Sequence, residues 1–294
     1  MRCVRGERGR FARTSDCGRL PLRRVIRALL WDVDGTLAET ERDGHRVAFN
    51  HAFEALGVPW RWSEQHYGEL LAVAGGRERF LHDMSRRAEA PRDARQREAL
   101  AETVHRLKNQ IYEGIVRRGE LPLRAGVAEL LSECYRAHLP MGIVTTTSRG
   151  NVEALLEWHL DSHWEGHFAT IVSAKEAPRK KPDPQVYRLA LEALRLRPHE
   201  AVAIEDAPAG IEAAQRAGVS VIVTHSHYFP VWAAVGAFAF GPSLGRSEGW
   251  HPRADPRATR ITLDQIMRWY TGATKNAPRR SKRQSPGNRA ARRA

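Results

Sequence analysis

Five short apolar runs recur along the chain, and each of them ends in polar residues. They are VIRALLWDVD (25–34), MGIVTTTS (141–148), FATIVSA (168–174), AVAIEDA (201–207) and VSVIVTHS (219–226). Helical patterns separate the later runs, as in PQVYRLALEALRL (184–196) and AGIEAAQRAG (209–218). The second of these ends on a glycine, which is typical of a helix C-terminus. Apolar strands that alternate with helices predict a parallel α/β sheet covered on both faces.

Residues 42–118 break this alternation, because they contain no apolar run of strand type. FNHAFEAL (49–56) instead places its apolar residues at the i, i+3, i+4, i+7 spacing of one helix face. We therefore predict a Rossmann-like parallel sheet core, residues 25–40 and 120–270, with a small all-helical cap, residues 41–119, inserted after the first strand.

The positive charge of the chain is concentrated at its two ends. The formal net charge of +13 would favour an acidic partner, but residues 1–24 carry +6 and residues 271–294 carry +8, which leaves −1 for residues 25–270. Both ends lack apolar periodicity and are rich in arginine, so we expect disordered, solvated basic extensions. Nucleic acid is not the expected partner, although a non-catalytic polyanion binder that uses these tails is an alternative.

The apolar runs, the cysteines and the first residues of the chain indicate a soluble protein of a reducing compartment. No apolar run approaches the roughly 18 residues of a membrane span. The three cysteines, Cys3, Cys17 and Cys134, lack the spacing of a metal site or a disulfide framework. The first residues lack the apolar core of a secretory signal. We expect a monomer in a bacterial cytoplasm, with a plastid location as the alternative.

Polar residues gather at the carboxyl ends of the predicted strands, which is where open α/β sheets bind ligands. These residues are Asp32, Asp34, Thr145, Thr146, Thr147, Lys181, Glu205 and Asp206. Neighbouring carboxylates raise each other's cost of ionising unless a cation or a proton lies between them. Clustered acids suit Mg²⁺, whereas hydroxyl and ammonium groups suit a phosphoryl group. The sequence therefore predicts a site shared by Mg²⁺ and a phosphate.

Four motifs carry a resemblance to a known family. DVDGT (32–36), TTTS (145–148), KKPDP (180–184) and IEDAPAGIEAA (204–214) occur in the order of the four motifs of the haloacid-dehalogenase-like phosphohydrolases. The resemblance implies that Asp32 is the nucleophile and forms an aspartyl-phosphate.

The same resemblance implies the roles of the other motif residues. Asp34 protonates the leaving oxygen and then activates water. Asp32, the backbone carbonyl of Asp34, and Asp206 bind Mg²⁺, and Glu205 supports the ion through a water. Thr145 and Lys181 hold the phosphoryl oxygens. The neighbouring lysine of KKPDP, Lys180, is interpreted as a solvated loop charge.

Two further stretches narrow the resemblance. DVDGTLAETERDGHRVAFNHAF (32–53) and GGRER (75–79) are similar to the CbbY-type phosphatases, which remove a phosphate from xylulose 1,5-bisphosphate, an inhibitor of the carbon-fixing carboxylase of the Calvin cycle. The resemblance places around the substrate Glu41, Tyr67, Gly75, Gly76, Arg77, Glu78, Arg79, Thr146, Thr147, Ser148 and Arg149.

The two arginines of GGRER suit a second, non-reacting phosphate, because a guanidinium group binds phosphate oxygens in pairs. The alternative is that Arg77 and Arg79 face different ways on a helix and that one is a surface charge. One departure from the family lies near the site, where Ala174-Lys175 replaces a Gly-Asp pair.

The resemblance implies a Mg²⁺-dependent phosphatase whose partner is a small sugar phosphate, xylulose 1,5-bisphosphate or a similar ketose bisphosphate. A β-phosphoglucomutase-like enzyme is the alternative, since those mutases share the motifs and the cap. The two differ in whether water or a second sugar hydroxyl releases the phosphate from the aspartate.

Overall fold

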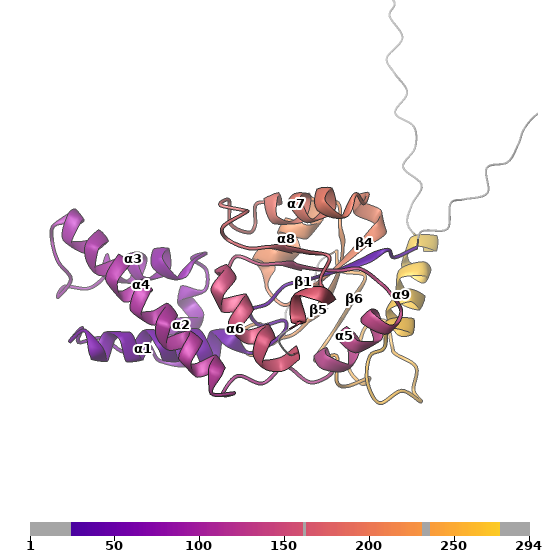
Figure 1. The fold of residues 1–294 in the computed structure, drawn as a ribbon, viewed down its shortest axis with the longest axis horizontal. Coiled ribbons are helices and arrows are strands. Elements are labelled where there is room, and N and C mark those ends of the chain that lie inside the picture. Colours follow the sequence, from indigo (N-terminus) through magenta and orange to yellow (C-terminus); the bar gives the residue numbers. More distant parts are fainter. Residues whose placement is uncertain (1–24, 161–162, 231–235, 277–294) are drawn as a thin grey trace, which may run out of the picture.

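The protein is described here from a computed structural model that covers residues 25–160, 163–230 and 236–276. Its centre is one parallel sheet with the strand order β3-β2-β1-β4-β5-β6 (Figure 1). The strands are β1 (Ala28–Trp31), β2 (Met141–Val144), β3 (Thr170–Val172), β4 (Ala201–Glu205), β5 (Ser220–Thr224) and β6 (Ala239–Gly241). The predicted parallel α/β sheet is therefore confirmed.

Helices cover both faces of the sheet, and the side chains of β1 show why its sequence is uniformly apolar. Leu29 and Trp31 enter a core with α5 (Val127–Arg136), α6 (Arg149–Leu160) and α9 (Leu263–Asn276). Leu30 enters the opposite core with α7 (Gln185–Leu194) and α8 (Pro208–Arg216). Successive strand residues point to opposite faces, so a strand buried on both sides needs every position to be apolar. Two 3₁₀ turns, η2 (Trp164–His167) and η3 (Pro198–Glu200), complete this part of the fold.

The strand β6 was not predicted. It has three residues and is held by β5 on one side and by pairing of Phe240 with His251 on the other. The segment 241–260 was expected to be a loop without a role. It nevertheless packs Leu244 and Trp250 into the core.

The segment between β1 and α5 is helical. It contains the π-helical turn η1 (Thr40–His45) and the helices α1 (Arg46–Ala55), α2 (Glu64–Leu70), α3 (Gly76–Met84) and α4 (Ala94–Arg117), which lie to one side of the sheet (Figure 1). We refer to η1 and α1 to α4 together as the cap.

The cap has an aromatic core of its own, centred on Trp62. The indole ring of Trp62 lies 5.0 Å from the ring of Phe53, and its Nε1 donates to Asp83 at 2.7 Å. The side chain of Asn50 bonds both backbone polar groups of Trp62, at 2.7 and 3.0 Å. Because the buried polar groups of Trp62 are paired, burial of this residue carries little desolvation cost.

The helix α9 corrects one predicted boundary. It continues to Asn276, so the prediction of a disordered tail from residue 271 onward is wrong for its first six residues. The buried residues Ile266 and Tyr270 anchor the helix, and each residue added to a running helix gains a hydrogen bond at little cost. The predicted basic extensions otherwise lie outside the described residues. Among the described helices, none has the combination of length and apolar content that crossing a bilayer requires.

Two glycines form a matched pair that tests how α5 is packed. Gly126 (φ +85°) and Gly57 (φ +64°) both have left-handed backbones, but a Cβ at Gly126 would lie 2.3 Å from backbone atoms of Leu244 and Gly245, whereas nothing lies within 4 Å of one at Gly57. We expect Gly57→Ala to lower the free energy of unfolding by about 1 kcal/mol, the cost of the left-handed backbone alone. Gly126→Ala should cost at least twice as much, because backbone atoms cannot rotate away. Equal losses in denaturant unfolding would contradict this packing.

Candidate active site

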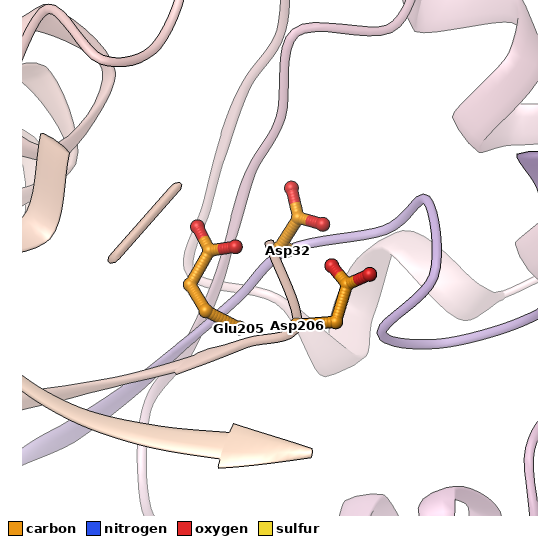
Figure 2. A group of neighbouring side chains, drawn as sticks. All are labelled: Asp32, Glu205 and Asp206. Carbon is orange, nitrogen blue, oxygen red and sulfur yellow. The ribbon is translucent and has the colours of Figure 1, made fainter. Parts of the chain in front are cut away.

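Three carboxylates converge at the carboxyl ends of the central strands (Figure 2). The register of β1 against β4 pairs Trp31 with Ile204, so Asp32 lies beside Glu205 and Asp206 although they are far apart in the sequence. The three side chains are buried, and each offers an oxygen within 4.8 Å of the others. The sheet edge thus brings together the acids of the first and fourth motifs.

A single lysine is the cation nearest to this cluster. Lys181 Nζ donates to Asp32 Oδ1 at 2.6 Å, to Glu205 Oε1 at 2.7 Å and to the carbonyl of Val144 at 2.9 Å. Burial opposes the charge of Lys181, but Asp32 and Glu205 raise its pKa above the ordinary value, so the ammonium group stays protonated. Tyr187 also donates its hydroxyl proton to Glu205.

Lys181 does not neutralise the three carboxylates. Burial raises the pKa of Asp32 above its ordinary range, and Lys181 only partly offsets that effect. Burial also raises the pKa of Asp206 to about 7, against a hydrogen bond from Ser226. A hard divalent cation such as Mg²⁺ binds where several oxygen ligands carry negative charge that no neighbouring side chain neutralises. The residues therefore fit a magnesium site, although one oxygen of Glu205 is already used by Lys181 and Tyr187.

The turn formed by DVDGT (32–36) passes so close to Asp206 that it needs a glycine at position 35. Gly35 has a φ of +84°, and a Cβ there would lie 2.1 Å from Asp206 Oδ2. The next residue, Thr36, donates from Oγ1 to Asp206 Oδ1 at 3.3 Å. A side chain at position 35 would therefore displace a carboxylate of the cluster.

The second aspartate of the motif has a different environment. Thr40 Oγ1 donates to Asp34 Oδ1 at 2.6 Å, and His45 Nε2 lies 3.1 Å from the same oxygen. Burial opposes ionisation, but His45 and Thr40 lower the pKa of Asp34 to about 2. The rings of His45 and Tyr112 lie 4.2 Å apart with a tilt of 32° between their planes. The positive charge of the buried Lys108 also lowers the pKa of Asp34, to a smaller extent. Sequence analysis missed His45 and Lys108 as site residues. His45 stands in the short stretch DGH (43–45) and Lys108 in a long helical pattern, and neither context indicates a position near Asp34.

The cap contributes a hydrogen-bonded group of three side chains. Tyr67 donates its hydroxyl proton to Glu41, and Arg79 donates to the Tyr67 oxygen at 2.6 Å and to Glu41 Oε2 at 3.3 Å. The Arg79 guanidinium group lies 5.0 Å from the Tyr67 ring centre, and the residue as a whole is only 6% exposed. The cap therefore holds a buried, oriented positive group.

The structure does not bring the two arginines of GGRER together. Arg77 pairs with Glu98 and, at 3.7 Å, with Glu102 on α4, whereas Arg79 points toward Glu41. Residues two apart on a helix differ in direction by about 200°, so they cannot share a face.

The interpretation of Lys180 as a solvated loop charge is wrong. Its Nζ pairs with Glu78 Oε2 on α3 at 2.7 Å, which joins the third-motif loop of the core to the cap. A Cβ at Gly75 would lie 2.1 Å from the same Nζ, so the pair also depends on a glycine there. Lys175, which replaces an acid of the family, is exposed.

The residues after β2 divide into two groups. Thr146 lines the cleft described below. Thr145 Oγ1 accepts from the backbone N–H of Thr147 at 3.2 Å, and Ser148 Oγ accepts from that of Asn151 at 3.3 Å, which caps α6. Arg149 pairs with glutamates at 153 and 165.

A cleft of about 550 Å³ lies where the acids of the core face the cap. This volume suits a small-molecule ligand. The predicted site residues that line it are Asp32, Asp34, Glu41, Gly75, Arg79, Thr146, Lys181, Glu205 and Asp206. Those that the structure does not place in the lining are Tyr67, Gly76, Arg77, Glu78, Thr145, Thr147, Ser148 and Arg149. Sequence analysis missed Tyr228 and Phe229, which follow β5 and also line the cleft.

Comparisons with known proteins agree with this geometry. Residues 26–218 match the profile of the haloacid dehalogenase-like hydrolases. The plasmid-encoded protein CbbY of Cupriavidus necator is 39% identical over 251 residues, which are 84% of this chain and 98% of that protein. The crystal structure of CbbY from Rhodobacter sphaeroides in complex with phosphate has 38% identity and a TM-score of 0.69, and covers 74% of this chain and 95% of that one. The crystal structure of a CbbY mutant from Rhodobacter sphaeroides in complex with xylulose 1,5-bisphosphate has 37% identity and a TM-score of 0.70. The match covers 76% of this chain and 97% of that one.

The pKa of Asp34 depends on His45. Because His45 lowers that pKa, His45→Gln should raise it by about one unit or more. The measurement is a titration of ¹³C-labelled aspartate carboxyls by NMR, with Asp34→Asn to assign the signal. His51→Gln is the matched control, since His51 lies exposed on α1 and pairs only weakly with Glu54, at 3.9 Å. An unchanged or lower pKa in His45→Gln would contradict the contact.

Proposed function

The chain belongs to the haloacid dehalogenase-like hydrolase family as a CbbY homologue, and we propose that it is a Mg²⁺-dependent sugar-phosphate phosphatase that acts on xylulose 1,5-bisphosphate or a similar ketose bisphosphate. At the coarser level it is a phosphoric monoester hydrolase. Its action in a cytoplasm, as a monomer and in connection with the Calvin cycle, is part of the proposal.

One observation carries the proposal. A single cleft has the nucleophile candidate Asp32, its partner Lys181 and the acid Asp34 on one wall, and Arg79 with Glu41 on the other. The first wall suits a reacting phosphoryl group, because its donors and acids surround the place where charge changes. The second wall offers a cation and an acceptor for the rest of a sugar phosphate.

The reaction would begin at Asp32. Its carboxylate oxygen attacks phosphorus, and the bond between phosphorus and the sugar oxygen breaks with its electron pair on that oxygen. Lys181, which stays an ammonium group, holds Asp32 in place and faces the phosphoryl oxygens. When bound by Asp32, Asp206 and the backbone carbonyl of Asp34, Mg²⁺ would supply charge neutralisation for those oxygens.

Asp34 would move the protons. It is ionised in the free enzyme, so it must take up a proton before it can give one to the departing sugar oxygen. The negative charge of an incoming phosphate raises the pKa of Asp34, and His45, in contact at 3.1 Å, is a donor within reach. In the second half, the ionised Asp34 takes a proton from the water that cleaves the bond between Asp32 and phosphorus.

The cap would select the substrate. Arg79 is buried and held by Tyr67 and Glu41, so its position is set before a ligand binds. A bisphosphate offers a second dianion that a guanidinium fork binds in a bidentate manner. Arg77 has no such place in this proposal, because its charge is satisfied by glutamates of α4.

The test is phosphate release with Mg²⁺ from xylulose 1,5-bisphosphate, ribulose 1,5-bisphosphate, fructose 1,6-bisphosphate and β-glucose 1-phosphate. We expect the first substrate to be preferred, and Asp32→Asn to abolish release, because an amide oxygen is a poor nucleophile toward phosphorus. Equal rates on all four would remove the proposed specificity. Glucose 6-phosphate formed from β-glucose 1-phosphate would favour the mutase alternative.

Arg79 and Arg77 provide a matched pair for the cap. Arg79→Met should lower kcat/KM for the preferred bisphosphate by about 10- to 100-fold, since a charge-assisted hydrogen bond contributes about 1.5–3 kcal/mol. Arg77→Met should stay within about twofold of the wild type, because surface ion pairs contribute little. Steady-state kinetics with a monophosphate as the second substrate separates a lost phosphate contact from a misfolded cap. Similar losses in both variants would contradict the role of Arg79.

A further inference from the structure

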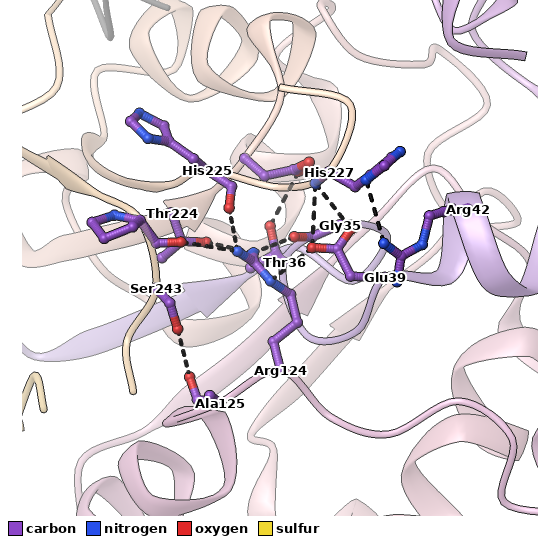
Figure 3. A network of polar contacts seen from close by, with 12 residues as sticks. Gly35, Thr36, Glu39, Arg42, Arg124, Ala125, Thr224, His225, His227 and Ser243 are labelled. Carbon is purple, nitrogen blue, oxygen red and sulfur yellow. Dashed lines mark hydrogen bonds and ion pairs between the residues drawn. The ribbon is translucent and has the colours of Figure 1, made fainter. Parts of the chain in front are cut away.

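Arg124 makes more polar contacts around the active site than its place outside the four motifs would suggest. It lies where the chain returns from the cap to the core, and its side chain is 9% exposed. All three guanidinium nitrogens have partners: Nε pairs with Glu39 at 3.2 Å, one terminal nitrogen donates to the Gly35 carbonyl and to Thr224 Oγ1 at 2.9 Å, and the other donates to the His225 carbonyl (Figure 3).

These contacts join the two loops that flank Asp206. On one side, the Gly35 turn approaches the Asp206 carboxylate so closely that no side chain fits at position 35. On the other side, Ser226 forms a hydrogen bond with Asp206 directly after the His225 carbonyl that Arg124 holds. Arg124 therefore contacts Gly35 and His225, and the residue that follows each of them, Thr36 or Ser226, forms a hydrogen bond with Asp206.

Arg124 also fixes both connections between the cap and the core. Its backbone N–H donates to the Leu37 carbonyl at 2.8 Å, next to the antiparallel pairing of Ala38 with Leu123. Glu39, its ion-pair partner, accepts in addition from the backbone N–H of His227 at 3.1 Å. The outgoing linker, the returning linker and the loop after β5 thus meet at one guanidinium group.

An arginine suits this position for a geometric reason. Its planar fork donates in several fixed directions, whereas a lysine ammonium group has the same charge but cannot reach the separate acceptors that Arg124 contacts. Burying a cation is costly unless its donors are satisfied, and here backbone carbonyls, a hydroxyl and a carboxylate satisfy them.

We propose that Arg124 is a positioning residue for the metal pocket, which holds the Gly35 turn and the His225–Ser226 loop against Asp206 and ties both to the cap linkers. The inference rests on the Mg²⁺ site of the proposed function. Loss of the fork would let the two loops separate, so Asp206 and the backbone carbonyl of Asp34 would bind the ion less well.

The experiment is a calorimetric titration of the full chain with MgCl₂ alone, without substrate. Arg124→Lys keeps the charge, and Arg124→Met removes it. We expect the dissociation constant for Mg²⁺ to rise about tenfold in Arg124→Lys and further in Arg124→Met, as is usual when a residue that orients a metal ligand is changed. Arg260→Met is the matched control: Arg260 pairs with Glu133 at 2.6 Å and bonds a backbone carbonyl, but lies away from the cleft. Its Mg²⁺ affinity should equal that of the wild type.

Thermal unfolding without metal separates positioning from folding. If Arg124→Met does not fold, Arg124→Lys decides. Glu39→Gln removes the ion pair with Arg124 but keeps an oxygen that accepts from the backbone N–H of His227, so it should weaken Mg²⁺ binding by a smaller factor. Folded Arg124 variants that bind Mg²⁺ within twofold of the wild type would overturn the inference and leave the proposed function intact. A wild type whose Mg²⁺ binding is absent, or unchanged by Asp206→Asn, would overturn the magnesium site itself and the inference with it.

Discussion

Three neighbouring buried carboxylates, only two of which contact a lysine, set the main constraint on this molecule. Asp32, Glu205 and Asp206 lie within reach of one another, and Lys181 contacts only the first two. Burial disfavours three ionised carboxylates side by side, so a proton or a further cation among them stabilises the arrangement. The neighbouring backbone follows the same constraint: Gly35 leaves room for Asp206, and Gly210 leaves room for Glu205, where a Cβ would lie 2.0 Å from a carboxylate oxygen.

The two aspartates of the first motif have opposite environments, although one residue separates them. Burial among acids raises the pKa of Asp32, whereas His45 and Thr40 lower that of Asp34. These directions are opposite to the ones the proposed roles need, because a nucleophile must be ionised and an acid must be protonated. A divalent cation beside Asp32 would favour its ionised form, and the negative charge of a bound phosphate would favour protonation of Asp34. The difference arises from the cap, because His45 and Thr40 belong to η1, while the partners of Asp32 come from the core. The cap is therefore part of the chemistry as well as a cover.

The contacts between cap and core are both apolar and polar. Ala48 of α1 and Ile115 and Val116 of α4 belong to the main hydrophobic core. Glu78 of α3 meets Lys180 of the core, and Glu39 of the outgoing linker meets Arg124 of the returning one. Tyr228, beyond β5, lies 5.8 Å from the ring of Tyr67 in the cap. Ion pairs of this kind contribute little stability each, so their main effect is to restrict the positions in which the cap fits.

The sequence alone determined the features that depend on local pattern. Continuous apolar runs required strands buried on both faces, and acids directly after two paired strands required a shared site, because parallel strands end at one edge. Only the tertiary structure decided the features that depend on which segments meet. It placed Arg77 against α4 and Arg79 against Glu41, paired Lys180 with Glu78, and gathered both cap linkers and the loop after β5 around Arg124. It also added β6, whose three residues form a strand only because β5 offers an unpaired edge. Local spacing shows which face of an element is buried, but it does not show which distant segment packs against that face.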